Sequence, residues 1–178
     1  MQRKIPPIGI GGVIMLILAL HFSFGTSTTI TAPQVDRPGL RVGATFTAVF
    51  TITNAQNAFG WQANVTFDKT HVNVQNITLL SPWTGTNSFF RSSYNNTNGN
   101  LIAAMTFTSG SGYTNSGTAN MFQTTFVVKK ASYLSAFHLV STAENIGFGA
   151  MALDPNTNQA SLTLIDGGFC NLSHCPLS

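Results

Sequence analysis

The chain has 178 residues, about enough for one domain, and only 7% of them are charged. Eight basic and five acidic residues give a formal charge of +3; without Arg3 and Lys4, six basic residues face five acidic ones and the charge is +1. Apart from Lys129 and Lys130 no basic cluster remains, which argues against a nucleic-acid partner, since phosphate binding needs several positioned cations.

The N-terminus has the pattern of a targeting segment. Arg3 and Lys4 precede an apolar run over residues 8–24, and Ser23–Gly25 supplies small residues at the positions that a signal peptidase reads. The run approaches the ~20 residues needed to cross a bilayer. A cleaved signal peptide and an uncleaved anchor helix therefore both remain open.

This pattern sets our expectations for localisation and for the first domain boundaries. We expect residues 1–25 to be an apolar helix that directs export, which places the protein outside the cell or on its surface. If the helix is not cleaved, residues 8–25 would tether the chain to a membrane. The polar residues 26–33 read as a linker.

Alternating apolar and polar residues predict the first strands, at residues 45–53, 59–67 and 72–80. A turn over Asp68–Thr70 separates the last two. Asn64 falls on the solvent-facing side of the second strand. The opposite, core-facing side of that strand consists of Phe59, Trp61, Ala63, Val65 and Phe67.

Residues 81–100 hold no period and read as a long irregular loop. The aromatic residues in it could form an exposed binding platform, because aromatic rings stack on sugars and anchor protein interfaces. The alternative is that they plug the end of the core. The candidate binding residues are Trp83, Phe89, Phe90 and Tyr94.

Further short strands are expected after this loop, and no window in the mature part shows a capped helical period. Eight or nine strands with frequent turns predict an all-β jelly-roll sandwich over residues 34–168, followed by a C-terminal tail over residues 169–178. The later strands are expected at residues 101–107, 122–128, 136–140, 147–153 and 160–165.

Catalysis is poorly supported by the composition, so we predict a protein that is not an enzyme. Five acidic residues, mostly in turns, do not suggest the two carboxylates of a glycosidase site. His71 reads as a surface residue beside a turn, and His138 lies inside a strand with no nucleophile motif nearby. No resident cofactor is expected. Calcium is one interpretation of Asp154, Asn156 and Asn158, and a plain turn is the other.

Two kinds of covalent modification are predicted if the chain is exported. Cys170 and Cys175 are expected to form a small disulfide loop in the tail, since export implies an oxidising compartment. A metal site that uses the adjacent His174 lacks a fourth ligand. Four Asn-x-Ser/Thr sequons are candidates for N-glycosylation and begin at Asn64, Asn76, Asn95 and Asn171.

The order of these motifs resembles that of cohesin domains over residues 34–168. The motifs are the segments Gly43–Thr47, Asn57–Gln62, Phe67–Lys69, Ser116–Lys129 and Leu164–Gly168. The resemblance implies a nine-stranded jelly-roll sandwich related in fold to cellulose-binding modules. It also implies dockerin modules as partners, often in polysaccharide-degrading assemblies. Ala44 stands where the family usually has Asp, and the chain has a single copy of the module.

Three functions follow as hypotheses. The first is a non-catalytic, cohesin-like module for protein–protein binding at the cell surface. The second is a carbohydrate-binding module, which a row of exposed aromatic residues would favour. The third is a structural subunit of a surface layer or filament, which an unpaired strand edge would favour.

Overall fold

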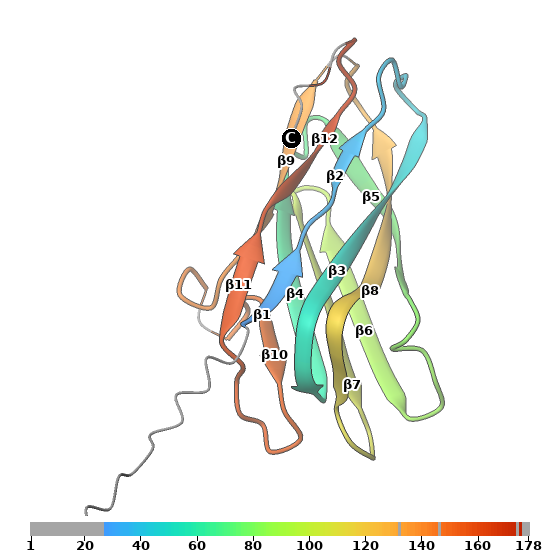
Figure 1. Cartoon of the computed structure of the whole chain (residues 1–178). Helices are drawn as coiled ribbons and strands as arrows, with labels where there is room; N and C mark the ends of the chain where they lie inside the picture. Colours follow the sequence, from blue (N-terminus) through green and yellow to red (C-terminus); the bar gives the residue numbers. More distant parts are fainter. Residues whose placement is uncertain (1–26, 132, 146, 174, 176–178) are drawn as a thin grey trace, which may run out of the picture.

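The computed structural model describes residues 27–131, 133–145, 147–173 and 175. Within them the regular structure is β-sheet, and no helix is long or apolar enough to cross a membrane. The expected N-terminal apolar helix lies outside the described residues. The predicted all-β sandwich is confirmed, because two sheets pack face to face (Figure 1).

The smaller sheet has five strands and the larger has seven. The smaller sheet is ordered β11 (Leu162–Ile165), β1 (Thr28–Thr31), β3 (Thr45–Ala58), β8 (Tyr113–Val128) and β5 (Val72–Leu79). The larger sheet is ordered β2 (Gln34–Asp36), β12 (Gly167–Cys170), β9 (Leu134–Leu139), β4 (Gly60–Phe67), β7 (Asn100–Phe107) and β6 (Ser88–Asn95). Strand β10 (Met151–Leu153) pairs with β4 beside this path.

The first and last strands run parallel and pass together from one sheet to the other. Strand β1 pairs with β11 in the smaller sheet, and β2 pairs with β12 in the larger one. At the crossing, Ala32 N donates to Ile165 O (2.8 Å) and Gly168 N donates to Pro33 O (3.0 Å). A Cβ on Gly167 would lie 2.3 Å from Pro33 O, so the two backbones can approach only at a glycine.

This crossing corrects two expected boundaries. The linker expected at residues 26–33 contains strand β1, and Ile30 within it is fully buried. The tail expected at residues 169–178 begins after β12, because Phe169 and Cys170 still pair with β9 and are buried. Each of these two strands has only four residues, too few to show a period, and β1 pairs with β11 more than 130 residues away in the sequence.

Stacked aromatic rings join the two sheets. Phe126 of β8 lies with its ring centroid 5.3 Å from Phe46 in its own sheet. Across the core it meets Phe137 at 5.0 Å and Phe67 at 5.6 Å. Burial of each such side chain contributes on the order of 1.5–3 kcal/mol. The largest fully buried side chains also include Trp83, Phe50, Phe122, Phe169, Ile30 and Ile52.

The expected loop over residues 81–100 contains a strand. Strand β6 pairs with β7 along eight residues and forms one edge of the larger sheet. Its period is hidden because Phe89 and Phe90 are adjacent yet face opposite sides. Only its inner side meets the core, so most of its residues remain exposed and polar.

The predicted core side of β4 is correct except at its first residue. Trp61 and Phe67 are buried, whereas Phe59 precedes the strand and is only partly buried. The change Phe67→Ala should therefore lower the free energy of unfolding by about 3–5 kcal/mol, as truncation of a buried Phe does. The change Phe59→Ala should cost clearly less. Urea unfolding of both variants measures the difference, and equal losses would contradict this burial pattern.

Candidate functional site

The outer face of the larger sheet carries an apolar groove above small residues. Gly60 of β4 lies opposite Thr106 of β7, and Gln62 of β4 lies opposite Ala104. At Gly60 even a Cβ would approach Met105 O at 3.1 Å, so the floor there is bare backbone. Small side chains in neighbouring strands leave a depression on an otherwise continuous sheet surface.

Larger residues on the flanking strands wall this depression. Strand β6 supplies Phe89 and Arg91 on one side, and β10 supplies Met151 and Leu153 on the other. Phe89 is 58% exposed, which is unusual for an aromatic side chain of this size. The volume of the depression is about 380 Å³, within the range of ligand pockets. We call this feature the β6–β10 groove.

A tight turn after β10 completes the second wall. Asp154 Oδ1 accepts hydrogen bonds from the backbone N–H groups of Asn156 and Asn158, both at 2.8 Å, and Oδ2 accepts one from Asn158 Nδ2. The bonds from Asn158 are the main reason that the pKa of Asp154 lies below its ordinary value. Both carboxylate oxygens of Asp154 thus accept hydrogen bonds within the turn. This arrangement matches the interpretation of residues 154–158 as a plain turn.

The groove combines an apolar interior with opposite charges at its two sides. Arg91 stands on the β6 wall, and Asp154 lies across the floor on the other wall. Arg91 forms no ion pair within the described part of the chain. An apolar side chain could fill the floor while a carboxylate of the same partner meets Arg91.

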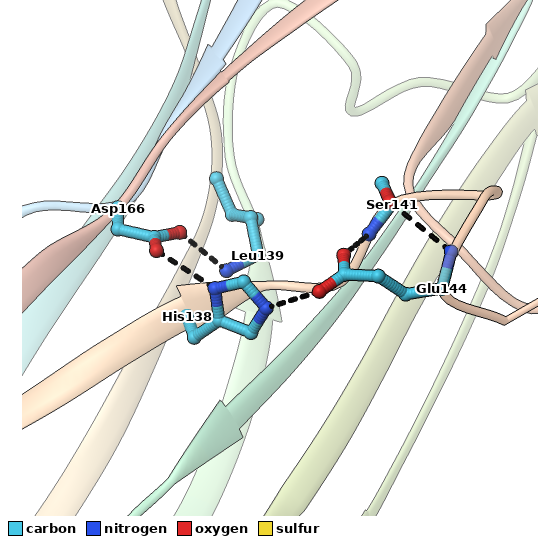
Figure 2. Close-up of polar contacts among 5 residues, drawn as sticks. All are labelled: His138, Leu139, Ser141, Glu144 and Asp166. Carbon is cyan, nitrogen blue, oxygen red and sulfur yellow. Dashed lines mark hydrogen bonds and ion pairs between the residues drawn. The ribbon is translucent and has the colours of Figure 1, made fainter.

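A second polar cluster lies on the same sheet at His138 of β9, as Figure 2 shows. His138 Nδ1 lies 2.7 Å from Asp166 Oδ2, and Nε2 lies 3.0 Å from Glu144 Oε1. Asp166 also accepts a hydrogen bond from Leu139 N at 2.8 Å, and Glu144 accepts one from Ser141 N at 2.6 Å. The imidazole therefore links the β11–β12 crossing to the loop after β9.

These contacts shift two pKa values. The hydrogen bond to Asp166, and then the one to Glu144, raises the pKa of His138 above its ordinary 6.5. The backbone N–H of Ser141 is the largest of the contacts that lower the pKa of Glu144 to about 2. Both ring nitrogens face carboxylates, and the Ser141 hydroxyl accepts from Glu144 N instead of contacting the ring. This is not the geometry of a serine nucleophile and its base.

The loop over residues 141–150 covers part of the face that we expected to be open to solvent. Asn64 Nδ2 donates to Phe148 O (3.0 Å), and Gln62 Nε2 donates to Gly149 O (3.0 Å). Asn64 is only 5% exposed as a result, so the prediction that it faces water is wrong. The alternation of residues within β4 could not reveal this, because the covering loop lies 80 or more residues further along the chain.

The four aromatic candidates do not form one platform. Trp83 is fully buried, and its Nε1 donates to Asn120 O at 2.7 Å. Phe90 turns inward toward Trp61, with 6.4 Å between ring centroids. Tyr94 is half exposed at the sheet edge, where its hydroxyl donates to Gln75 O. Of the four, Phe89 alone lines the β6–β10 groove.

The structure also places the predicted disulfide, the glycosylation candidates and His71. Cys170 and Cys175 form a disulfide. Asn171, like Asn64, is buried, whereas Asn76 and Asn95 are exposed. His71 is buried as well, at 4% exposure, beside the turn where we expected it at the surface.

Several residues of the groove and the polar cluster did not emerge from the sequence. Arg91 lies in the segment that was read as a loop, so its outward direction was hidden. Met151 and Leu153 were expected to form a strand, but their pairing with β4 is non-local. His138, Glu144 and Asp166 are brought together from three separate segments. The only available signal was the Asp-Pro-Asn turn beside β10.

Comparison with known proteins places this fold in a family. The sequence profile of the cohesin domain matches residues 29–165, which is most of the chain. The chain therefore belongs to the cohesin domain family, and the resemblance read from its motifs is confirmed. No curated protein sequence matches the chain.

Solved cohesin structures share the fold at low sequence identity. A non-cellulosomal cohesin from the archaeon Archaeoglobus fulgidus is 18% identical, with a TM-score of 0.62 over 83% of this chain and 93% of its own. The cohesin of a type I cohesin–dockerin complex from Clostridium thermocellum is 11% identical, with a TM-score of 0.65 over 83% and 100%. A type II cohesin module of the adaptor scaffoldin ScaA from Acetivibrio cellulolyticus is 17% identical, with a TM-score of 0.63 over 86% and 93%.

The His138 cluster predicts a stability that depends on pH. Folding raises the pKa of His138, so the protonated imidazole stabilises the fold. This stabilisation is fully present below about pH 6.5 and is lost as the pH rises through the pKa of His138 in the folded protein. Because folding lowers the pKa of Glu144, its effect is present above about pH 4.5 and is lost toward pH 2. The cluster should stabilise most between these limits.

Thermal unfolding of the wild type and of His138→Gln between pH 4.5 and 8.5 tests this prediction. The advantage of the wild type over the variant should shrink as the pH rises above 6.5. Because both proteins share every other titrating group, the comparison isolates the contribution of His138. A difference in Tm that stays constant across this range would show that His138 does not titrate as the contacts require.

Proposed function

We propose that this protein is a non-catalytic module that binds another protein through the β6–β10 groove. The groove is the observation that carries the proposal: an apolar depression on a sheet, with an exposed phenylalanine and an arginine that forms no ion pair among the residues that the structure describes. A rigid site limits the conformational entropy lost on binding. Exposed aromatic and arginine side chains are also the residue types that contribute most to protein interfaces.

The contacts in the groove favour a particular partner chemistry. The low floor at Gly60 and Ala104 admits an apolar side chain, which Phe89 and Met151 would flank. Arg91 would meet a carboxylate on the same partner segment. A dockerin-like module is the partner we infer, and the dockerin complexes formed by similar cohesins from Acetivibrio cellulolyticus and Clostridium thermocellum support this choice.

We further propose that the module works outside the cell or on its surface. The targeting pattern of residues 1–25 and the disulfide of Cys170 and Cys175 support export. If the N-terminal segment is retained, residues 8–25 would serve as the membrane tether. A polysaccharide-degrading assembly is one context in which such a module would operate.

Direct carbohydrate binding is less well supported. A carbohydrate-binding surface of the aromatic type needs several rings on one exposed face. Phe89 and Tyr94 point to opposite sides of β6, and Trp83 is inaccessible.

A pulldown from surface extract of the host tests the proposed function. Phe89→Ala should weaken capture of the bound protein at least tenfold, because loss of an interface anchor costs about 2 kcal/mol or more. Phe148→Ala is the matched control, since Phe148 is 59% exposed but does not line the groove. Arg91→Gln should also weaken capture, and more at low salt than at high salt.

The two phenylalanine variants decide the outcome together. If Phe89→Ala loses capture and Phe148→Ala retains it, the groove is supported as the binding site. Equal capture by both variants would place the binding site elsewhere. Retardation of the wild type in a glucan gel, abolished by Phe89→Ala, would instead favour carbohydrate binding at this groove.

A further inference from the structure

The fold divides the four sequons into two that are sealed and two that are accessible. Asn64 Nδ2 donates to Phe148 O, and Asn171 Nδ2 donates to Leu40 O and Lys130 O. Both side chains are at most 5% exposed. A sugar on either nitrogen would displace these hydrogen bonds and the chain segments that cover them, so the native fold does not accommodate it.

In the two accessible sequons, the side chains of Asn76 and Asn95 form hydrogen bonds with residues of their own sequon or turn at the protein surface. Asn76 Nδ2 donates to the hydroxyl of Thr78, the third residue of its own sequon, at 3.1 Å. Asn95 Oδ1 accepts hydrogen bonds from Thr97 N and Asn98 N at 2.9 and 3.0 Å. These bonds hold Oδ1 of Asn95 against the backbone of the turn, and Asn95 as a whole is exposed.

Both sites lie at one open edge of the sandwich, where β5 ends the smaller sheet and β6 ends the larger one (Figure 1). The side chains of Asn96 and Tyr94 bond to the β5 backbone at Val74 and Gln75, and the rest of this edge has no strand partner within the described residues. Unpaired strand edges can pair with another chain, and proteins usually protect them with charged residues. Here β5 carries no charged residue and β6 carries only Arg91.

We propose that Asn76 and Asn95 carry N-linked glycans that shield this open edge. A lipid-linked oligosaccharide diphosphate would be the donor. The asparagine amide nitrogen forms a bond to the anomeric carbon, the bond from that carbon to phosphate breaks, and the polyprenyl diphosphate leaves. The amide proton passes to a base of the transferase. The inference rests on the export proposed above and is independent of groove binding.

The glycans would leave the β6–β10 groove free. Asn95 lies six residues along β6 from Phe89, about 20 Å at the rise of a strand. Asn76 belongs to the other sheet. A module with both glycans can therefore still receive a partner at the groove, and its charge-poor surface gains solubility from the sugars.

Trypsin separates the four sequons, which makes occupancy measurable for each one. Cleavage after Arg41, Lys69, Arg91, Lys129 and Lys130 places Asn64, Asn76, Asn95 and Asn171 in four different peptides. The full chain is purified from the surface fraction or medium of its own host, and the peptides are measured by mass spectrometry. We expect glycan mass on the peptides 70–91 and 92–129 and none on 42–69 or 131–178.

Sequon variants test the cause and the consequence. Thr78→Ala and Thr97→Ala should each remove the glycan from their own peptide, whereas Thr78→Ser and Thr97→Ser keep a hydroxyl and should retain it. The double alanine variant should sediment as oligomers at concentrations where the glycosylated protein is monomeric, with an unchanged Tm. The double serine variant is the matched control and should remain monomeric.

Each other outcome overturns a defined part of the inference. Four unmodified peptides from exported protein would exclude glycosylation and leave export and groove binding untouched. Protein found only in the cytoplasm would overturn export and glycosylation together. Glycans on Asn64 or Asn171 in folded protein would contradict their burial, and a monomeric double alanine variant would exclude the shielding role.

Discussion

The packing of Phe126 between the two sheets is the contact on which the rest of the structure depends. Its ring touches Phe46 in its own sheet and both Phe67 and Phe137 in the other. These contacts fix which side of β3, β4, β8 and β9 faces inward. Because side chains alternate along a strand, they also fix which side faces outward. A shift of β4 by one residue would exchange its core and groove residues.

The candidate site follows from this fixed assignment of inward-facing and outward-facing side chains. With Trp61 turned inward, Gly60 and Gln62 must face outward, and the pairing with β7 sets Thr106 and Ala104 beside them. The small residues Gly60 and Ala104 lower the floor of the depression, and larger residues on β6 and β10 form its walls. The sheet holds this surface rigid, while the loop over residues 141–150 covers the adjoining part of the same face. The proposed binding surface therefore occupies one end of the larger sheet.

The sequence predicted those parts of the fold that depend on local periodicity. The strands around Phe46, Trp61 and Phe126 were readable because each has one buried and one exposed side. The sequence did not reveal the terminal strand β1, the edge strand β6 or the loop that covers Asn64. Each of these is defined by a pairing or contact with a residue far along the chain. For the same reason the sequence predicted Phe89 as a binding residue but grouped it with Trp83, which the fold buries. Composition drew attention to the aromatic residues but could not assign each of them to a face of the sheet.

Hydrogen–deuterium exchange of the module, measured free and in complex with the protein it captures, tests the central claim most directly. If the partner sits in the β6–β10 groove, amides of β6, β7 and β10 and of the turn at Asp154 should exchange more slowly in the complex. Exchange of the threonine-rich strands β1 and β3 in the smaller sheet should be unchanged. Protection confined to β1, β3 and β8 would contradict the account, because it would place the partner on the opposite face of the sandwich.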